Sequence, residues 1–200
     1  MSMFSMQTRH KLVEIGLTLT VAFCAWIFQL TVINLFAFHG ALCNLPLTIT
    51  IIWGYVFGSS SLPITQGELR HKSTAYIFLR QLMQGSVSGA LMGALVGSLY
   101  ASMLPIYPVC YPLIGFICGY FCARNISSES LLCIPVVLLG TVAAEFIMAW
   151  QLSLAGRVDV FAHLAQIALP ESLLNALIAP FIYFPIRSWQ DFYLTKDSPA

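Results

Sequence analysis

Charged residues are scarce in this sequence. It contains nine Lys and Arg residues and eight Asp and Glu residues, so 8% of its 200 residues are charged, whereas 58% are hydrophobic. Water would not solvate such a chain as a compact soluble domain, and we therefore expect lipid to be its solvent. The net charge of +1, with no basic patch that includes aromatic residues, gives no reason to expect nucleic acid as a partner.

Groupings typical of metal sites and active sites are also lacking. The six cysteines contain no C-x-x-C pair, and Cys118 and Cys122, which share a helical face, have no further ligand in their segment. We see no Ser/His/Asp, Cys/His or paired-carboxylate constellation. We therefore predict no disulfide, no metal, no cofactor and no enzymatic activity. The histidines lie near loop ends and are expected to be solvated: His10, His39, His71 and His163.

Long hydrophobic runs, in contrast, occupy most of the chain. A helix needs about 20 apolar residues to cross ~30 Å of hydrocarbon. We predict an all-α protein with a single transmembrane domain, residues 1–200, built as a polytopic bundle of about six helices. The first run is too long for a signal peptide, and the second is short and is expected to be tilted or partly re-entrant. The six runs are 13–37, 41–58, 82–104, 107–123, 131–155 and 164–186.

The distribution of positive charge predicts the orientation. Lys and Arg accumulate in cytoplasmic loops, and with six spans and the N-terminus inside, Arg157 alone among the nine lies outside. This favours a multi-pass inner-membrane protein with both ends in the cytoplasm. Residues 59–81 then form a cytoplasmic loop, in which Arg70, Lys72 and Arg80 are expected to contact lipid headgroups or cytoplasmic partners.

Glycine recurs at four-residue spacing in the third and fourth runs. This spacing places the glycines along one helical face, where two backbones can approach closely. We predict a tightly packed helix interface there. Its partner is another helix of this chain, a second protein or copy, or, in a third interpretation, a pore or ligand groove. The glycines are Gly85, Gly89, Gly93, Gly97, Gly115 and Gly119.

Polar residues inside the runs mark further candidate sites. Glu145 lies in the fifth run, where an acid costs about 2.5–3.5 kcal/mol on insertion scales. Asn175 of the antiparallel sixth run is expected within about a turn of the same depth and is a candidate partner. Such a pair would fix the bundle or serve a proton relay, although Glu145 is the one carboxylate that we expect deep in a span. Pro180 should kink the last helix.

The last run carries the stretch Leu-Pro-Glu-Ser-Leu-Leu-Asn-Ala-Leu-Ile-Ala-Pro, followed by aromatic residues and an arginine. It resembles the C-terminal signature of the rod shape-determining protein MreD family. The glycine-rich third run is similar to that family's Gly-x-x-x-Gly helix, although Ser98 and its neighbours stand where the family commonly has an aspartate. The signature residues that match are Pro170, Leu174, Asn175, Ala179, Pro180 and Arg187.

This resemblance implies a non-enzymatic membrane component of the bacterial cell-elongation machinery for peptidoglycan synthesis. It implies membrane lipid, MreC and other elongation proteins as partners, a link to MreB filaments, and no small-molecule substrate. It also implies a fold similar to the substrate-binding subunits of energy-coupling-factor transporters, so a vitamin-type transporter subunit is the alternative function. That alternative needs an aromatic, polar pocket, for which the available residues are Tyr107, Tyr111, Trp150, Gln151, His163 and Gln166.

Overall fold

A computed structural model describes residues 3–31, 42–58, 86–121 and 129–196, and the side chains of 16–31, 42–58, 86–121 and 131–190. These residues form helices and turns, with no strand among them, which confirms the predicted all-helical class for the described part of the chain. The elements are α1 (Met3–Thr31), α2 (Leu45–Val56), α5 (Val87–Leu99), α6 (Tyr107–Cys118), the 3-10 helix η2 (Gly119–Phe121), α7 (Glu129–Leu154), α8 (Val160–His163), the π-helix η3 (Leu164–Ala168) and α9 (Leu169–Lys196).

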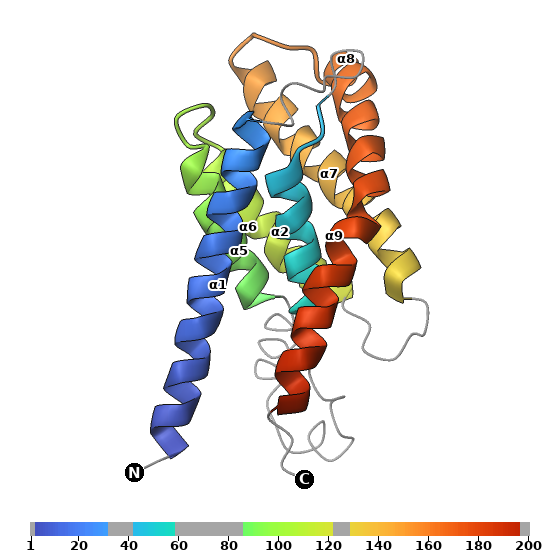
Figure 1. Cartoon of the computed structure of the whole chain (residues 1–200). Coiled ribbons are helices and arrows are strands. Elements are labelled where there is room, and N and C mark those ends of the chain that lie inside the picture. Colours follow the sequence, from blue (N-terminus) through green and yellow to red (C-terminus); the bar gives the residue numbers. More distant parts are fainter. Residues whose placement is uncertain (1–2, 32–41, 59–85, 122–128, 197–200) are drawn as a thin grey trace, which may run out of the picture.

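The long helices run along a common axis in alternating directions (Figure 1). The start of α1 and the end of α9 lie at the bottom of that view, and the turn between α7 and α8 lies at the top. We call these the lower end and the upper end of the bundle. α2 enters from the side of the upper end and runs toward the lower end.

The described apolar stretches of the helices fall into two groups by length. Two helical stretches are long and apolar enough to cross a membrane, Leu131–Leu154 with 24 residues and Val160–Gln190 with 31 residues. They correspond to the fifth and sixth hydrophobic runs. In the first four runs, the described apolar stretches have 10–17 residues: Gly16–Thr31, which is the second part of the 29-residue α1, and the helices Leu45–Val56, Val87–Leu99 and Tyr107–Phe121. Six membrane crossings therefore stay a prediction.

The last helix is longer than its hydrophobic run indicates. α9 continues to Lys196, ten residues past the predicted end at 186, with Pro180 and Pro185 inside it. Each proline removes one backbone donor and strains one turn, and the turns on either side remain helical. Figure 1 shows α9 changing direction partway along its length.

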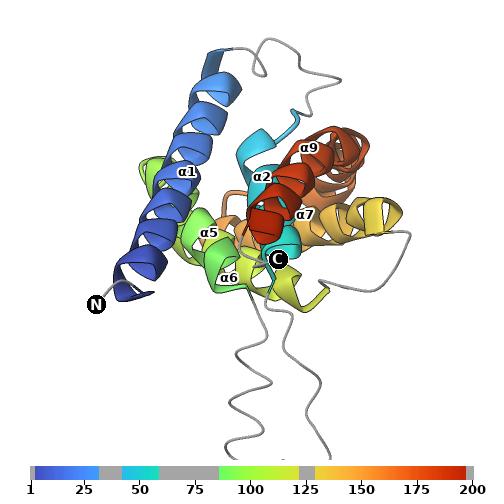
Figure 2. The ribbon, with the colours of Figure 1, turned by 60° about the horizontal axis from the view of Figure 1, so that its bottom comes forward.

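α2 is the central helix of the bundle and contacts α1, α5, α6, α7 and α9 (Figure 2). Every residue from Pro46 to Val56 is buried. The side chain of Asn44 caps the helix by accepting a hydrogen bond from Leu47 N at 3.2 Å. Its run of β-branched residues has a low intrinsic helix propensity, so packing on all sides is what stabilises this helix. At 12 residues, α2 is only about 18 Å long.

Three helices touch backbone to backbone at one point. Gly54 of α2, Gly89 of α5 and Gly115 of α6 meet there, and a Cβ atom added to Gly89 would lie 2.5 Å from Gly54 Cα. Real Cβ atoms essentially never approach within 3.0 Å of another heavy atom. We call this contact the glycine junction, and no side chain fits at Gly89 unless the helices move apart. Gly54 is isolated in its run, so no glycine spacing predicted its part in this contact.

The other glycines of α5 extend this contact along α6. A Cβ added to Gly93 would meet the backbone of Tyr111, and one added to Gly97 would meet the backbone of Tyr107. Gly119 lies equally close to Ser86, the residue before α5. The described part of the glycine face is therefore covered by α6 of the same chain. Gly85 lies outside the described residues.

Candidate functional site

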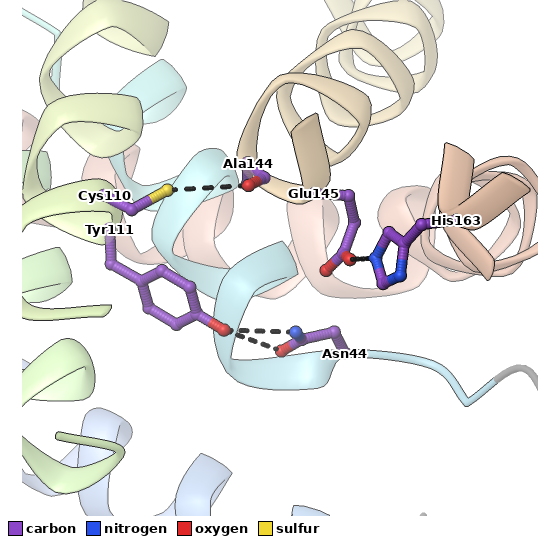
Figure 3. Close-up of polar contacts among 6 residues, drawn as sticks. All are labelled: Asn44, Cys110, Tyr111, Ala144, Glu145 and His163. Atoms are coloured by element: carbon purple, nitrogen blue, oxygen red, sulfur yellow. Dashed lines mark hydrogen bonds and ion pairs between the residues drawn. The ribbon is translucent and has the colours of Figure 1, made fainter. Parts of the chain in front are cut away.

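Buried and half-buried polar side chains gather toward the upper end of the bundle, around the start of α2 (Figure 3). They come from six segments that are far apart in the sequence, and hydrogen bonds connect most of them. We call this group the polar layer. Its members are Gln29 of α1, Asn44, Tyr111 of α6, Thr141 and Glu145 of α7, His163 of α8, and Glu171 and Asn175 of α9.

Asn175 joins three segments of the polar layer. Its side chain is fully buried; Nδ2 donates to Thr141 Oγ1 at 3.2 Å, and Oδ1 accepts from the backbone N–H of Asn44 at 2.8 Å. The first bond connects α9 to α7, and the second connects α9 to the segment that opens α2. A buried amide with both ends hydrogen-bonded fixes the relative positions of its neighbours, because breaking either bond leaves a polar group without a partner.

The start of α2 is held from two further sides. Asn44 Nδ2 donates to the hydroxyl of Tyr111 at 3.1 Å, which connects it to α6 (Figure 3). Gln29 of α1 donates to the carbonyl of Cys43 and accepts from the backbone N–H of Leu45, both at 2.9 Å. Side chains of α1, α6 and α9 therefore satisfy backbone groups or the capping residue where α2 begins. Unpaired, these groups would be costly in an apolar environment.

Glu145 has a different partner from the one predicted. Its Oε2 lies 3.0 Å from Nε2 of His163, and the two side chains are 8% and 10% exposed (Figure 3). Asn175 lies within a turn of the same depth, as expected, because its partner Thr141 is one turn before Glu145. The expectation that His163 is solvated is wrong, since the fold turns its ring inward onto α7. Hydropathy places a residue along the membrane normal but does not determine which way it faces.

Glu171 is a second buried carboxylate, which sequence analysis missed. It is 7% exposed and lies close to the side chains of Asn44 and Asn175, and its Oε1 has no hydrogen-bond partner. Glu145 is therefore not the only acid buried in the bundle, whereas the prediction that it is the one carboxylate deep in a span concerns depth in the membrane and stays a prediction. Glu171 follows Pro170 near the start of the sixth run. Its four-residue spacing from Asn175 was the available signal, because that spacing places both residues on one helical face.

The π-helix Leu164–Ala168 aligns the polar residues on either side of it. His163 and Glu171 are eight residues apart and would differ by about 80° around an uninterrupted α-helix. A π-turn accommodates one extra residue, which reduces that difference to roughly 20° by the same helical geometry. The insertion therefore brings His163 onto the face of the helix that carries Glu171 and Asn175. π-turns occur frequently at functional sites.

The remaining signature residues of α9 pack within the bundle or form hydrogen bonds near the end of the helix. Ala179 is fully buried, and Pro170, Leu174 and Pro180 are partly buried. Arg187 lies toward the lower end, where it donates to Gln190 Oε1 at 2.9 Å, and Gln190 Nε2 donates to the Val56 carbonyl at 2.8 Å. These bonds connect the end of α9 to the end of α2. The loop residues Arg70, Lys72 and Arg80 lie outside the described residues.

The residues proposed for a ligand pocket do not share one environment. Tyr111 and His163 are engaged in bonds inside the polar layer, whereas Trp150 is 55% exposed. Among the described residues, no group of three His, Cys, Asp or Glu is arranged to hold a metal ion. What the polar layer provides is hydrogen bonding between helices and a concentration of acidic groups.

Comparisons of the chain with protein-family models, with curated proteins and with solved structures find no match. The resemblance to the MreD family therefore stays an expectation from the sequence signature described above.

Proposed function

We propose that the protein is a multi-pass protein of the bacterial inner membrane with both ends in the cytoplasm. The two helices long and apolar enough to cross a membrane, the shorter apolar helical stretches of the same bundle, and the positions of the start of α1 and the end of α9, both at the lower end, support this topology. Reporter fusions at Gly156, in the turn between α7 and α8, and after Ala200 test it. We expect them on opposite sides of the membrane, and the same side for both would contradict the topology.

Within that membrane, we propose that the chain is a non-enzymatic component of the cell-elongation machinery, scaffolding MreC and linking it to MreB filaments. The observation that carries this proposal is the position of Asn175. This signature residue forms hydrogen bonds that join α9 to α7 and to the start of α2. A signature residue used to hold helices together fits a scaffold, whose function is to present a fixed surface to partners.

Depletion in a rod-shaped host tests this function. We expect depleted cells to become round while their uptake of vitamins is unchanged, and we expect MreC to copurify with the protein. Loss of uptake without rounding would instead select the transporter subunit. Complementation with Asn175→Ala should fail to restore rod shape, whereas Leu177→Ala, which alters an exposed residue on the same helix, should restore it.

A further inference from the structure

The turn between α7 and α8 exposes large apolar side chains at the upper end of the bundle (Figure 1). Leu154 ends α7 and is 78% exposed, and Phe161 lies in α8 and is 82% exposed. These are the two highest exposed fractions among the large hydrophobic residues whose side chains the structure describes. No residue of α8 is buried, and residues 155–157 of the turn are exposed as well. The bundle therefore offers these two side chains little apolar surface on which to pack.

The two stretches that are long and apolar enough to cross a membrane meet at this turn. Leu131–Leu154 ends before it, and Val160–Gln190 begins after it. The 24 residues of the first stretch are about 36 Å long, whereas the hydrocarbon of a bilayer is ~30 Å thick. When this stretch crosses the membrane, as proposed above, its end lies at the membrane surface. Trp150, which is 55% exposed one turn before Leu154, belongs to a residue type enriched at that level.

The turn also carries an exposed cation between the two apolar side chains. Arg157 is exposed, and among the residues whose side chains the structure describes, none forms an ion pair with it. A guanidinium binds phosphate well because its N–H groups match two phosphate oxygens at once. Its apolar stem can lie along hydrocarbon while the charged head reaches the polar headgroups. Asp159, the other charged residue of the turn, accepts a hydrogen bond from Phe161 N at 3.0 Å and so caps α8.

We propose that the segment Leu154–Phe161 is an interfacial anchor, in which Leu154 and Phe161 enter the acyl-chain region of one leaflet and Arg157 binds a lipid phosphate. The inference rests on the proposed membrane crossing, and it holds whichever side of the membrane the upper end faces. Lipid fits this surface because one molecule supplies both hydrocarbon and phosphate at this depth. α8 also carries His163, so the anchor helps to hold that ring against Glu145.

Fluorescent labels on single cysteines test the anchor in the full chain, reconstituted in phosphatidylcholine vesicles. Some of the lipids carry a nitroxide, either near the headgroup or near the end of the acyl chain, and iodide is the quencher in the water. The background is Cys24→Ser with Cys122→Ser, because Cys24 is exposed and Cys122 lies outside the described residues, whereas the other cysteines are buried. The labelled variants are Leu154→Cys, Phe161→Cys, Ala155→Cys and Leu173→Cys.

We expect the labels at positions 154 and 161 to be quenched more strongly by the nitroxide near the headgroup than by the nitroxide near the chain end. Ala155→Cys is the matched control, because Ala155 is exposed in the same turn without a large apolar side chain, and its label should be the most accessible to iodide. Arg157→Gln should reduce the quenching of the label at position 161 by the headgroup nitroxide, whereas Arg157→Lys should retain it.

The label at Leu173 separates failure of the anchor from failure of the membrane crossing. Leu173 is 60% exposed and lies about 18 Å along the helix from Phe161, near the middle of ~30 Å of hydrocarbon. Its label should be quenched from the chain end. With that result, labels at 154 and 161 that are as open to iodide as the label at Ala155 would overturn the anchor alone. A label at Leu173 that is open to iodide would overturn the crossing, and the anchor with it.

Two further results would also count against the anchor. Labels at Leu154 and Phe161 that are shielded from iodide, yet quenched by neither lipid, would overturn it, because a protein surface would then cover them. An Arg157→Gln variant with unchanged quenching at position 161 would overturn the phosphate contact.

Discussion

The glycine junction and the polar layer hold the same central helix in opposite ways. At the junction, α2 contacts α5 and α6 because Gly54, Gly89 and Gly115 have no side chains. In the polar layer, the start of α2 is held because Asn175 and Gln29 present side-chain amides in the required positions. Close packing is lost when any atom is added, whereas a hydrogen-bond network is lost when a group is removed. The two regions should therefore respond to different substitutions.

The largest effect is expected at the glycine junction. Gly89→Leu places a side chain where even a Cβ atom would lie 2.5 Å from Gly54 Cα. Separating the helices should lower the free energy of unfolding by about 3 kcal/mol or more, which exceeds ordinary overpacking because the obstacle is backbone. Unfolding in mixed micelles measures this change. Gly16→Ala is the control, since nothing lies within 4 Å of the added Cβ, and it should be tolerated. A stable Gly89→Leu would contradict the junction.

The next largest effect is expected at Asn175. Asn175→Ala leaves the Asn44 N–H and the Thr141 hydroxyl without their present partners, and each unsatisfied buried group costs about 1–3 kcal/mol. We expect a loss of at least about 2 kcal/mol in total on that basis. The same unfolding assay applies. Leu177→Ala, at a residue that is 72% exposed, should change little. Equal losses in the two variants would show that the amide bonds contribute nothing.

The contact between Glu145 and His163 should show coupling rather than a large individual effect. The two side chains satisfy one another, so removing either one disrupts the same interaction. In a double-mutant cycle with Glu145→Ala and His163→Ala, we expect a coupling energy of about 1–2 kcal/mol, typical of residues in direct contact. Additive losses would mean that α8 and α7 are held together by other contacts.

The smallest of the four effects is expected at Ser86, a polar residue beside the glycine face. Ser86 Oγ accepts from Gly89 N at 2.9 Å and caps α5, and it donates to the Phe57 carbonyl at 3.1 Å. Ser86→Ala should cost about 1 kcal/mol, as for other helix caps. Ser98→Ala, which removes a hydroxyl bonded only to Ala94 O within the same helix, should cost less. A loss at Ser86 larger than that at Asn175 would reverse the comparison of the two regions.

Much of the fold could be predicted from hydropathy and glycine spacing. Each of the six hydrophobic runs overlaps a helix. In an apolar environment no water is present to bond the backbone N–H and C=O groups, and a helix satisfies them within the segment. The helix ends differ from the run ends where polar residues continue a helix, as in α9 beyond residue 186. The four-residue spacing of Gly89, Gly93 and Gly97 indicated a packed face, and the fold supplied its partner, α6.

The candidate site could be predicted from the sequence only in part. Glu145 and Asn175 stood out because polar groups are rare inside apolar runs. Nothing in the sequence identified His163 and Thr141 as the hydrogen-bond partners of Glu145 and Asn175. The sequence contains no signal for the π-helix that turns His163 inward, and Glu171 near the start of its run was indistinguishable from an interfacial acid.

By itself, the amino-acid sequence determined that this chain is apolar and helical, because composition and hydropathy are properties of single residues and their near neighbours. It also determined that one face of the third run could approach another backbone. Only the tertiary structure decided that Gly54 completes the glycine junction and that Glu171, His163 and Asn44 meet around the start of α2. Those contacts join residues up to 131 positions apart, and their geometry depends on how the helices rotate and pack, which no local pattern encodes.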